Sequence, residues 1–79
     1  MRLDKYLKIS RLIKRRTVAN DACDAGRVMI NEKSAKASAQ VKEGDRITIR
    51  FGNKETKVEV LKVEEHVRKE EAEEMFRYL

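Results

Sequence analysis

Residues 11–16 read Arg-Leu-Ile-Lys-Arg-Arg and place four cations within six positions, around the apolar pair Leu12 and Ile13. One short helical pattern precedes this basic segment, and a second follows it directly. Four positive charges so close together repel one another, so clustering them does not stabilise the fold. We interpret the basic segment as a surface that two helices hold in place for a strongly negative partner, most simply a phosphate backbone.

The composition describes one small basic domain. The chain has 79 residues and a net charge of +5, which allows a single domain with a small core. Residues 1–36 carry ten cations and four anions, whereas residues 37–79 carry nine cations and ten anions. A basic half beside a balanced half indicates nucleic acid or an acidic membrane as the partner.

The compartment is predicted from cysteine content and apolar runs. Cys23 is the single cysteine, so no internal disulfide can form, which is typical of a reducing compartment. The N-terminus lacks an apolar signal region, and no apolar run approaches the roughly 20 residues that span a bilayer. We therefore expect a soluble, cytoplasmic protein with no membrane partner.

Two helices are predicted around the basic segment. Residues 2–9 have an apolar face at helical spacing, with Asp4 in the first turn, where a carboxylate suits the helix dipole. The second helix is predicted to have Thr17 as its N-cap and to stop at Gly26. Further on, alternating apolar residues predict strands at 27–30, 46–51 and 57–63, joined by turns at 31–33, 41–45 and 52–54.

The order of these elements predicts an α+β fold, with two short N-terminal helices packed on a small, mostly antiparallel sheet of three to five strands. In the strand at 46–51, Ile47, Ile49 and Phe51 are expected on the buried face. Residues 69–79 are acidic and follow a helical pattern, which predicts a C-terminal helix.

No arrangement of residues indicates catalysis or a cofactor. His66 is the only histidine and has no nucleophile nearby, so we interpret it as a surface residue. Cys23 lies among small helical residues and is interpreted as a buried, unreactive thiol. There is no Cys/His cluster with metal spacing and no glycine pattern for nucleotides. We expect a non-enzyme without metal or cofactor.

The basic segment could simply keep a small protein in solution. Its position beside a helix N-terminus favours phosphate binding, because backbone N–H groups attract anions there and arginine can hold two phosphate oxygens. Three of the four aromatic residues are expected in the core or in helix packing, so no base-stacking platform is predicted. With no base-reading helix for DNA either, recognition of folded RNA by shape is the better match.

Four motifs in this order resemble the S-four (S4) RNA-binding domain family. They are Arg-Leu-Asp-Lys-Tyr-Leu at 2–7, Lys-Arg-Arg-Thr-Val-Ala at 14–19, Gly-Arg-Val-Met-Ile-Asn at 26–31 and Val-Lys-Glu-Gly-Asp at 41–45. The resemblance covers about residues 1–50 and implies that RNA lies across the helix pair and the adjoining strand turn. Glu32 and Arg15 depart from it, at positions where glycine and serine are common.

The resemblance implies that RNA is faced by Arg2, Lys5, Arg11, Arg16 and Lys36. The charge pattern adds Lys8, Lys14 and Arg15. The resemblance also implies that Asp4 orients a neighbouring cation, and Thr17 is expected to replace the capping hydroxyl that Arg15 lacks. We expect residues 1–62 to form the RNA-binding domain and residues 63–79 an acidic helical tail.

Within the family, the chain resembles the small stand-alone members of bacterial ribosome-associated quality control. This implies a factor, monomeric off the ribosome, that binds obstructed large subunits carrying peptidyl-tRNA. It would contact large-subunit rRNA and tRNA and assist a nascent-chain tailing factor in adding alanine to stalled chains. Two alternatives are a heat-shock S4-type rescue or recycling protein, which usually has a longer basic extension, and a protein-interaction module acting through the acidic helix at 69–79.

Overall fold

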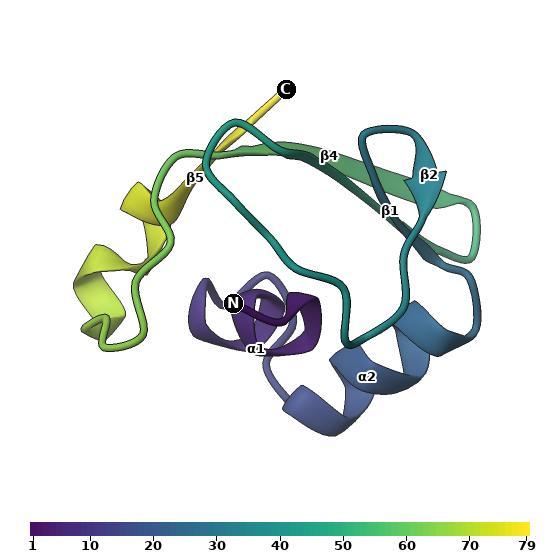
Figure 1. Ribbon diagram of the computed structural model, residues 1–79, viewed down its shortest axis with the longest axis horizontal. Helices are drawn as coiled ribbons and strands as arrows, with labels where there is room; N and C mark the ends of the chain where they lie inside the picture. Colours follow the sequence, from purple (N-terminus) through teal and green to yellow (C-terminus); the bar gives the residue numbers. More distant parts are fainter.

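The computed structural model describes residues 1–79 and has the predicted α+β architecture (Figure 1). Figure 1 shows the sheet arching over the first helix, with the second helix beneath one end of the sheet and a short C-terminal helix at the other. The elements are the helices α1 (Leu3–Ile9) and α2 (Arg16–Asp24), the strands β1 (Val28–Ile30), β2 (Lys33–Ser34), β3 (Arg46–Phe51) and β4 (Lys54–Val60), the 3-10 helix η1 (Lys69–Met75) and the strand β5 (Phe76–Tyr78).

Five strands form the sheet in the order β2-β1-β3-β4-β5, and all neighbours are antiparallel. The hairpin of β3 and β4 is its centre, closed by the two-residue turn of Gly52 and Asn53. Gly52 has a φ of +59°, a left-handed conformation that glycine adopts without steric cost. In the turn between β1 and β2, Asn31 and Glu32 are also left-handed, with φ of +51° and +69°. The turn is therefore formed without the glycine that is common at the second position.

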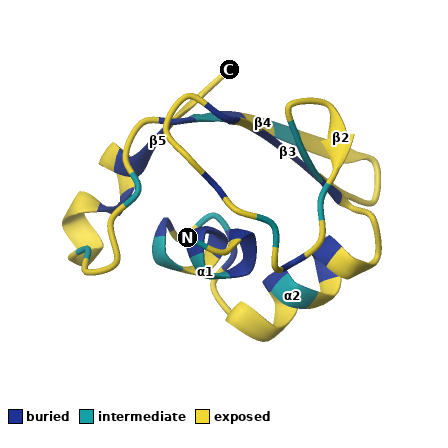
Figure 2. Cartoon of the chain, in the orientation of Figure 1, coloured by how far each residue is buried: buried dark blue, intermediate teal, exposed yellow.

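One apolar core of 16 buried residues lies between the helices and the sheet. Figure 2 shows buried positions on the sides of α1 and α2 that face the sheet, and exposed positions on the far side of α2. The small side chains that α2 contributes let its backbone lie close to α1. The main core residues are Leu3, Tyr6 and Leu7 from α1, Ala19, Ala22 and Cys23 from α2, and Val28, Ile47, Ile49, Val58 and Val60 from the sheet.

The predicted C-terminal helix is present but shorter than residues 69–79. It is the 3-10 helix η1, which ends at Met75, and the residues beyond it form β5 and pair with β4. Phe76 is buried and Tyr78, two residues later, lies on the same face of the sheet. This period of two is the geometry of a strand, and pairing with the open edge of β4 favours it over another helical turn.

The prediction that Phe51 is buried is wrong. Ile47 and Ile49 of the same strand are buried, as expected, whereas Phe51 is 45% exposed. The three side chains share one face of β3 because side chains alternate along a strand. Phe51 lies at the margin of the helix-covered area: one hollow separates it from Val18 and Ala22 of α2, and it also lines an open groove.

Candidate nucleic-acid interface

The buried carboxylate of Asp4, in the first turn of α1, gathers side chains from both helices. Nε of Arg2 donates to Oδ1 at 3.1 Å, and Nη2 of Arg2 lies 3.3 Å from Oδ2. From α2, Nδ2 of Asn20 donates to Oδ2 at 3.2 Å, and Nε of Arg16 lies 3.5 Å from the same oxygen. The backbone N–H of Lys5 donates to Oδ1 at 2.8 Å. One carboxylate, itself 2% exposed, therefore ties α1 to α2.

Asp4 is ionised, and its single negative charge is paired with two positively charged arginines. Burial by itself raises the pKa of Asp4, but hydrogen bonds from Arg2 and Asn20, with the charge of Arg16, outweigh burial and lower the pKa below its ordinary value. One carboxylate faces two guanidinium groups, so the cluster keeps a net positive charge. The side chains of Arg2 and Arg16 are 46% and 49% exposed, and arginine has five N–H donors. Donors on both therefore remain for phosphate oxygens.

The prediction of Thr17 as N-cap of the second helix is wrong. The helix begins at Arg16, its extended N-cap residue is Arg15, and no side chain caps it. The early start brings Arg16 within reach of Asp4, and this ion pair ties the first turn of α2 to α1. Thr17 lies within that turn and lines a hollow of about 280 Å³ with Asp4, Arg16, Asn20 and Asp21.

Three other cations that are predicted to face RNA line a second hollow, of about 160 Å³. We call this hollow the basic notch. It is lined by Lys8, Arg11 and Lys14, together with Ile9, Glu65 and Val67. None of the three cations is in an ion pair within the chain. Arg11 has a φ of +64°, which costs an L-residue about 1–2 kcal/mol. Buried Ile13 anchors this turn, and its N–H donates to the carbonyl of Leu7 at 3.1 Å.

Lys5 and Arg15 are placed differently from the cations of the notch. Nζ of Lys5 lies 2.9 Å from Oε1 of Glu65, and this hydrogen bond lowers the pKa of Glu65. An exposed pair of this kind is weak and is screened by salt, so a phosphate can displace Glu65. Arg15 is exposed at the start of α2 and makes no ion pair.

Lys36 is exposed in the loop between β2 and β3, which lies across the start of α1. The carbonyl of Ala39 accepts a hydrogen bond from the N–H of Leu3 at 2.8 Å, and that of Ala37 accepts from the N–H of Asp4 at 3.2 Å. These bonds fix the loop against the helix pair. Lys36 therefore stands beside the Asp4 cluster, although it is 32 positions away in the sequence.

The structure brings the cations that are predicted to face RNA together in two places. Two arginines meet at Asp4, and three further cations line the basic notch. Sequence reasoning missed two residues that shape them. Asn20 is four positions after Arg16 and so lies on the same face of α2, a spacing that could have identified it. Glu65 is 60 positions from Lys5, and no local pattern connects the two.

The remaining reactive side chains are placed as the sequence predicts. Cys23 is buried, and burial, together with the negative charges of Asp4 and Asp24, raises the pKa of its thiol to about 11. The thiol therefore stays protonated and unreactive at neutral pH. His66 is exposed.

No group of three His, Cys, Asp or Glu residues is arranged to hold a metal ion. No helix has both the length and the apolar character that crossing a bilayer requires.

Comparisons with known proteins identify the family. The S4 domain family model matches residues 1–47. The chain is 57% identical over 76 residues to the "RQC P-site tRNA stabilizing factor" of Halalkalibacterium halodurans, which is 96% of this chain and 86% of that protein. It is 53% identical to the factor of the same name from Bacillus subtilis over 79 residues, which is 100% of this chain and 92% of that protein.

Among solved structures, the trimeric structure of Vibrio cholerae Heat Shock Protein 15 superposes on the chain with a TM-score of 0.91. The two are 34% identical, and the match covers 100% of this chain and 81% of that one. The fold is therefore shared with a heat-shock protein as well as with the RQC P-site tRNA stabilizing factors.

Proposed function

Because the chain belongs to the S4 domain family and, within it, to the group of RQC P-site tRNA stabilizing factors, we propose that it is a non-enzymatic RNA-binding factor of bacterial ribosome-associated quality control. It binds obstructed large ribosomal subunits that carry peptidyl-tRNA, contacts both rRNA and tRNA, and assists a tailing factor in adding alanine to the stalled chain. It works in the cytoplasm and is a monomer off the ribosome. Near-full-length similarity to the named factors carries the assignment to this process.

The two cation groups supply a mechanism, which is electrostatic clamping. Asp4 fixes Arg2 and Arg16 before RNA arrives, so little side-chain freedom is lost on binding. The basic notch presents three further cations, which lie between Arg2 and Arg16 in the sequence. One group can contact rRNA while the other contacts the tRNA backbone, and the factor then holds the tRNA without any chemical step. In this proposal residues 1–62 supply the cations of the clamp, and the acidic residues 63–79 complete the sheet through β5.

The clamp predicts a steep dependence of binding on salt. If about six to eight phosphates are neutralised, the logarithm of the affinity should fall against the logarithm of the salt concentration with a slope between about −4 and −7. A protein whose cations only improve solubility would have a shallow slope. The measurement uses purified large subunits carrying peptidyl-tRNA at several salt concentrations.

Single-charge variants test the residues in the clamp. Arg2→Ala and Arg16→Ala should each weaken binding to these subunits about tenfold or more, because each removes charge-assisted hydrogen bonds. Lys42→Ala is the matched control, since Lys42 is an exposed cation without an ion pair in the turn before β3. Wild-type affinity in both arginine variants would remove the proposal.

A heat-shock rescue or recycling protein is the second candidate, because the Vibrio cholerae neighbour superposes over the whole chain. Such a protein would bind the same subunits without supporting alanine tailing. A tailing assay with the factor omitted and then restored separates the two. The protein-interaction alternative would dock a partner through Met75, Phe76 and Leu79. It loses support, because Met75 and Phe76 are buried in the fold and only Leu79 is exposed.

A further inference from the structure

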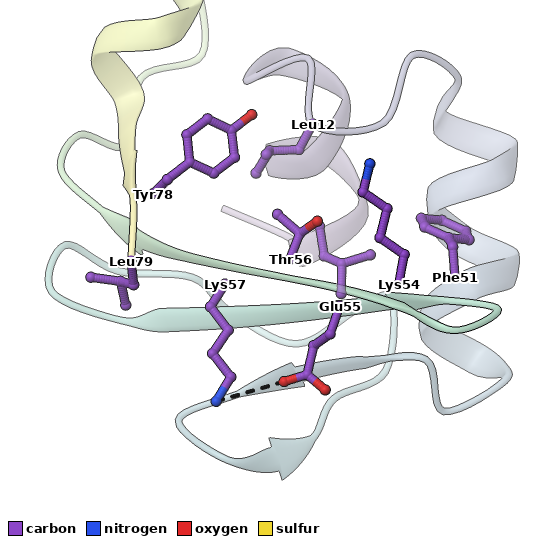
Figure 3. Close-up of a pocket in the computed structure, with 9 residues that line it drawn as sticks. Leu12, Phe51, Lys54, Glu55, Thr56, Lys57, Tyr78 and Leu79 are labelled. Carbon is purple, nitrogen blue, oxygen red and sulfur yellow. Dashed lines mark ion pairs between the residues drawn. The ribbon is translucent and has the colours of Figure 1, made fainter.

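An open groove of about 450 Å³ lies towards the hairpin end of the sheet, on the face that carries the helices, where the helices leave part of that face open (Figure 3). In the β3–β4 pairing, Ile49 stands opposite Thr56 and Phe51 stands opposite Lys54. These four side chains therefore share one face and form the floor of the groove. The lining of this aromatic groove consists of Leu12, Ile49, Phe51, Lys54, Glu55, Thr56, Lys57, Tyr78 and Leu79.

Two of the chain's four aromatic residues line the groove. Tyr78 is 69% exposed and Phe51 is 45% exposed, whereas Tyr6 and Phe76 are buried. Phe76 meets Tyr78 edge to face, with ring centroids 5.3 Å apart and planes at 89°. This contact orients the Tyr78 ring and leaves most of its surface open. Exposed aromatic rings on a sheet are the surfaces on which RNA-binding proteins stack unpaired bases.

The charges around the groove match a nucleic acid. Lys54 extends towards Leu12 on the side of the strands that carries Tyr78 (Figure 3), and it makes no ion pair. The carboxylate of Glu55 lies on the opposite side, paired with Lys57 at 3.6 Å. Leu12 belongs to the basic segment and directly follows Arg11 of the basic notch, so the segment proposed to bind RNA also lines the groove.

We propose that the aromatic groove takes an unpaired nucleobase of the RNA that the basic segment binds. The base stacks on Tyr78 or Phe51, and its phosphate lies towards Lys54. The inference rests on the proposed function, because the basic segment must bring RNA to the rim of the groove. An apolar protein segment would cover the same rings but would gain nothing from unpaired Lys54 or from the adjacent cations.

Ring-removing substitutions test the groove. Tyr78→Leu and Phe51→Leu keep an apolar side chain but remove the flat ring, and Tyr78→Phe keeps the ring. Each leucine variant should weaken binding to purified large subunits carrying peptidyl-tRNA, without other proteins, about five- to tenfold. Its salt slope should become shallower by at most about one, because only the phosphate near Lys54 depends on the stacked base. Tyr78→Phe should bind like the wild type, as should Leu61→Ala, an exposed control outside the groove.

A second measurement does not depend on affinity. Ultraviolet crosslinking of the wild-type complex should join Tyr78 or Phe51 to one nucleotide, and mapping should place that nucleotide in a loop or bulge. Urea unfolding of each variant verifies that the fold is kept. A crosslink confined to residues outside the groove would contradict the inference.

The outcomes separate this inference from the proposed function. If both leucine variants bind like the wild type while Arg16→Ala binds weakly, the groove proposal is wrong and the proposed function stands. If the leucine variants lose only the binding of a protein partner, the groove is a protein site and the inference is wrong. If the wild type itself fails to bind the subunits, both proposals fall.

Discussion

The phenolic hydroxyl of Tyr6 in α1 donates a 2.7 Å hydrogen bond to the backbone carbonyl of Met75 at the end of η1, 69 positions along the chain. The same carbonyl accepts from the N–H of Leu61 at 2.8 Å and from that of Lys62 at 3.1 Å. One buried oxygen therefore joins the first helix, the segment after β4 and the C-terminal region. Burial raises the pKa of Tyr6, so its hydroxyl stays protonated as a donor.

Tyr6→Phe should lower the free energy of unfolding by about 1 kcal/mol, because the carbonyl of Met75 loses one buried donor but keeps two others. Urea unfolding measures this change. Tyr78→Phe is the control, since its hydroxyl is exposed and makes no hydrogen bond within the chain. An equal loss of stability in both variants would contradict the role of the Tyr6 bond.

Asp4→Asn should weaken RNA binding although it makes the protein more positive. The neutral amide no longer attracts Arg2 and Arg16, so the two guanidinium groups lose their fixed positions. Glu43→Gln is the matched control, because it adds the same charge at an exposed position in the turn before β3. The affinity for subunits carrying peptidyl-tRNA should fall for Asp4→Asn and stay equal or rise for Glu43→Gln. Tighter binding by Asp4→Asn would mean that net charge alone decides affinity.

The lowered pKa of Asp4 predicts a specific dependence of stability on pH. In the unfolded chain an aspartate has a pKa of about 3.9, and in the folded protein the pKa of Asp4 lies below its ordinary value. The unfolded state therefore takes up the proton first. The contribution of Asp4 is complete well above the unfolded pKa and is lost as the pH falls through the folded pKa.

Urea unfolding of the wild type and of Asp4→Asn between pH 6 and pH 3 measures this contribution. The difference between the two proteins should shrink on acidification, because the other carboxylates titrate in both. A constant difference would show that the ionisation of Asp4 adds nothing to stability.

Glu65→Gln should strengthen RNA binding. The substitution releases Lys5 from its 2.9 Å ion pair, so one more cation becomes available to phosphate without competition. The affinity should rise a few-fold, and the salt slope should steepen by up to about one. Glu64→Gln changes the charge equally at an exposed neighbour without an ion pair. Equal gains in the two variants would assign the effect to net charge.

Local patterns in the sequence were enough to predict the architecture. The helix before the basic segment, the strand at 46–51 and the turn that begins at Asn31 depend on neighbouring residues, and all three are confirmed. The family resemblance, drawn from four short motifs, is confirmed by the S4 domain match over residues 1–47. Burial of Ile47 and Ile49 follows from alternation alone.

Features that depend on tertiary arrangement could not be predicted in this way. Phe51 has the alternation of a core residue, but its burial depends on how far the helices extend over the sheet. The strand after Met75 forms because β4 offers an open edge, which helical spacing in the sequence cannot reveal. The pairing of Lys5 with Glu65 likewise requires distant segments to meet, and RNA binding by the predicted site residues stays a prediction.

The loop that carries Ala37 and Ala39 has a consequence for how the interface can change. Because its carbonyls occupy the first amides of α1, an incoming phosphate meets side chains there and no unpaired backbone donors. Substituting one cation of the basic notch at a time should thus change the strength of attachment to RNA in steps, because Lys8, Arg11 and Lys14 hold no ion pair of the fold.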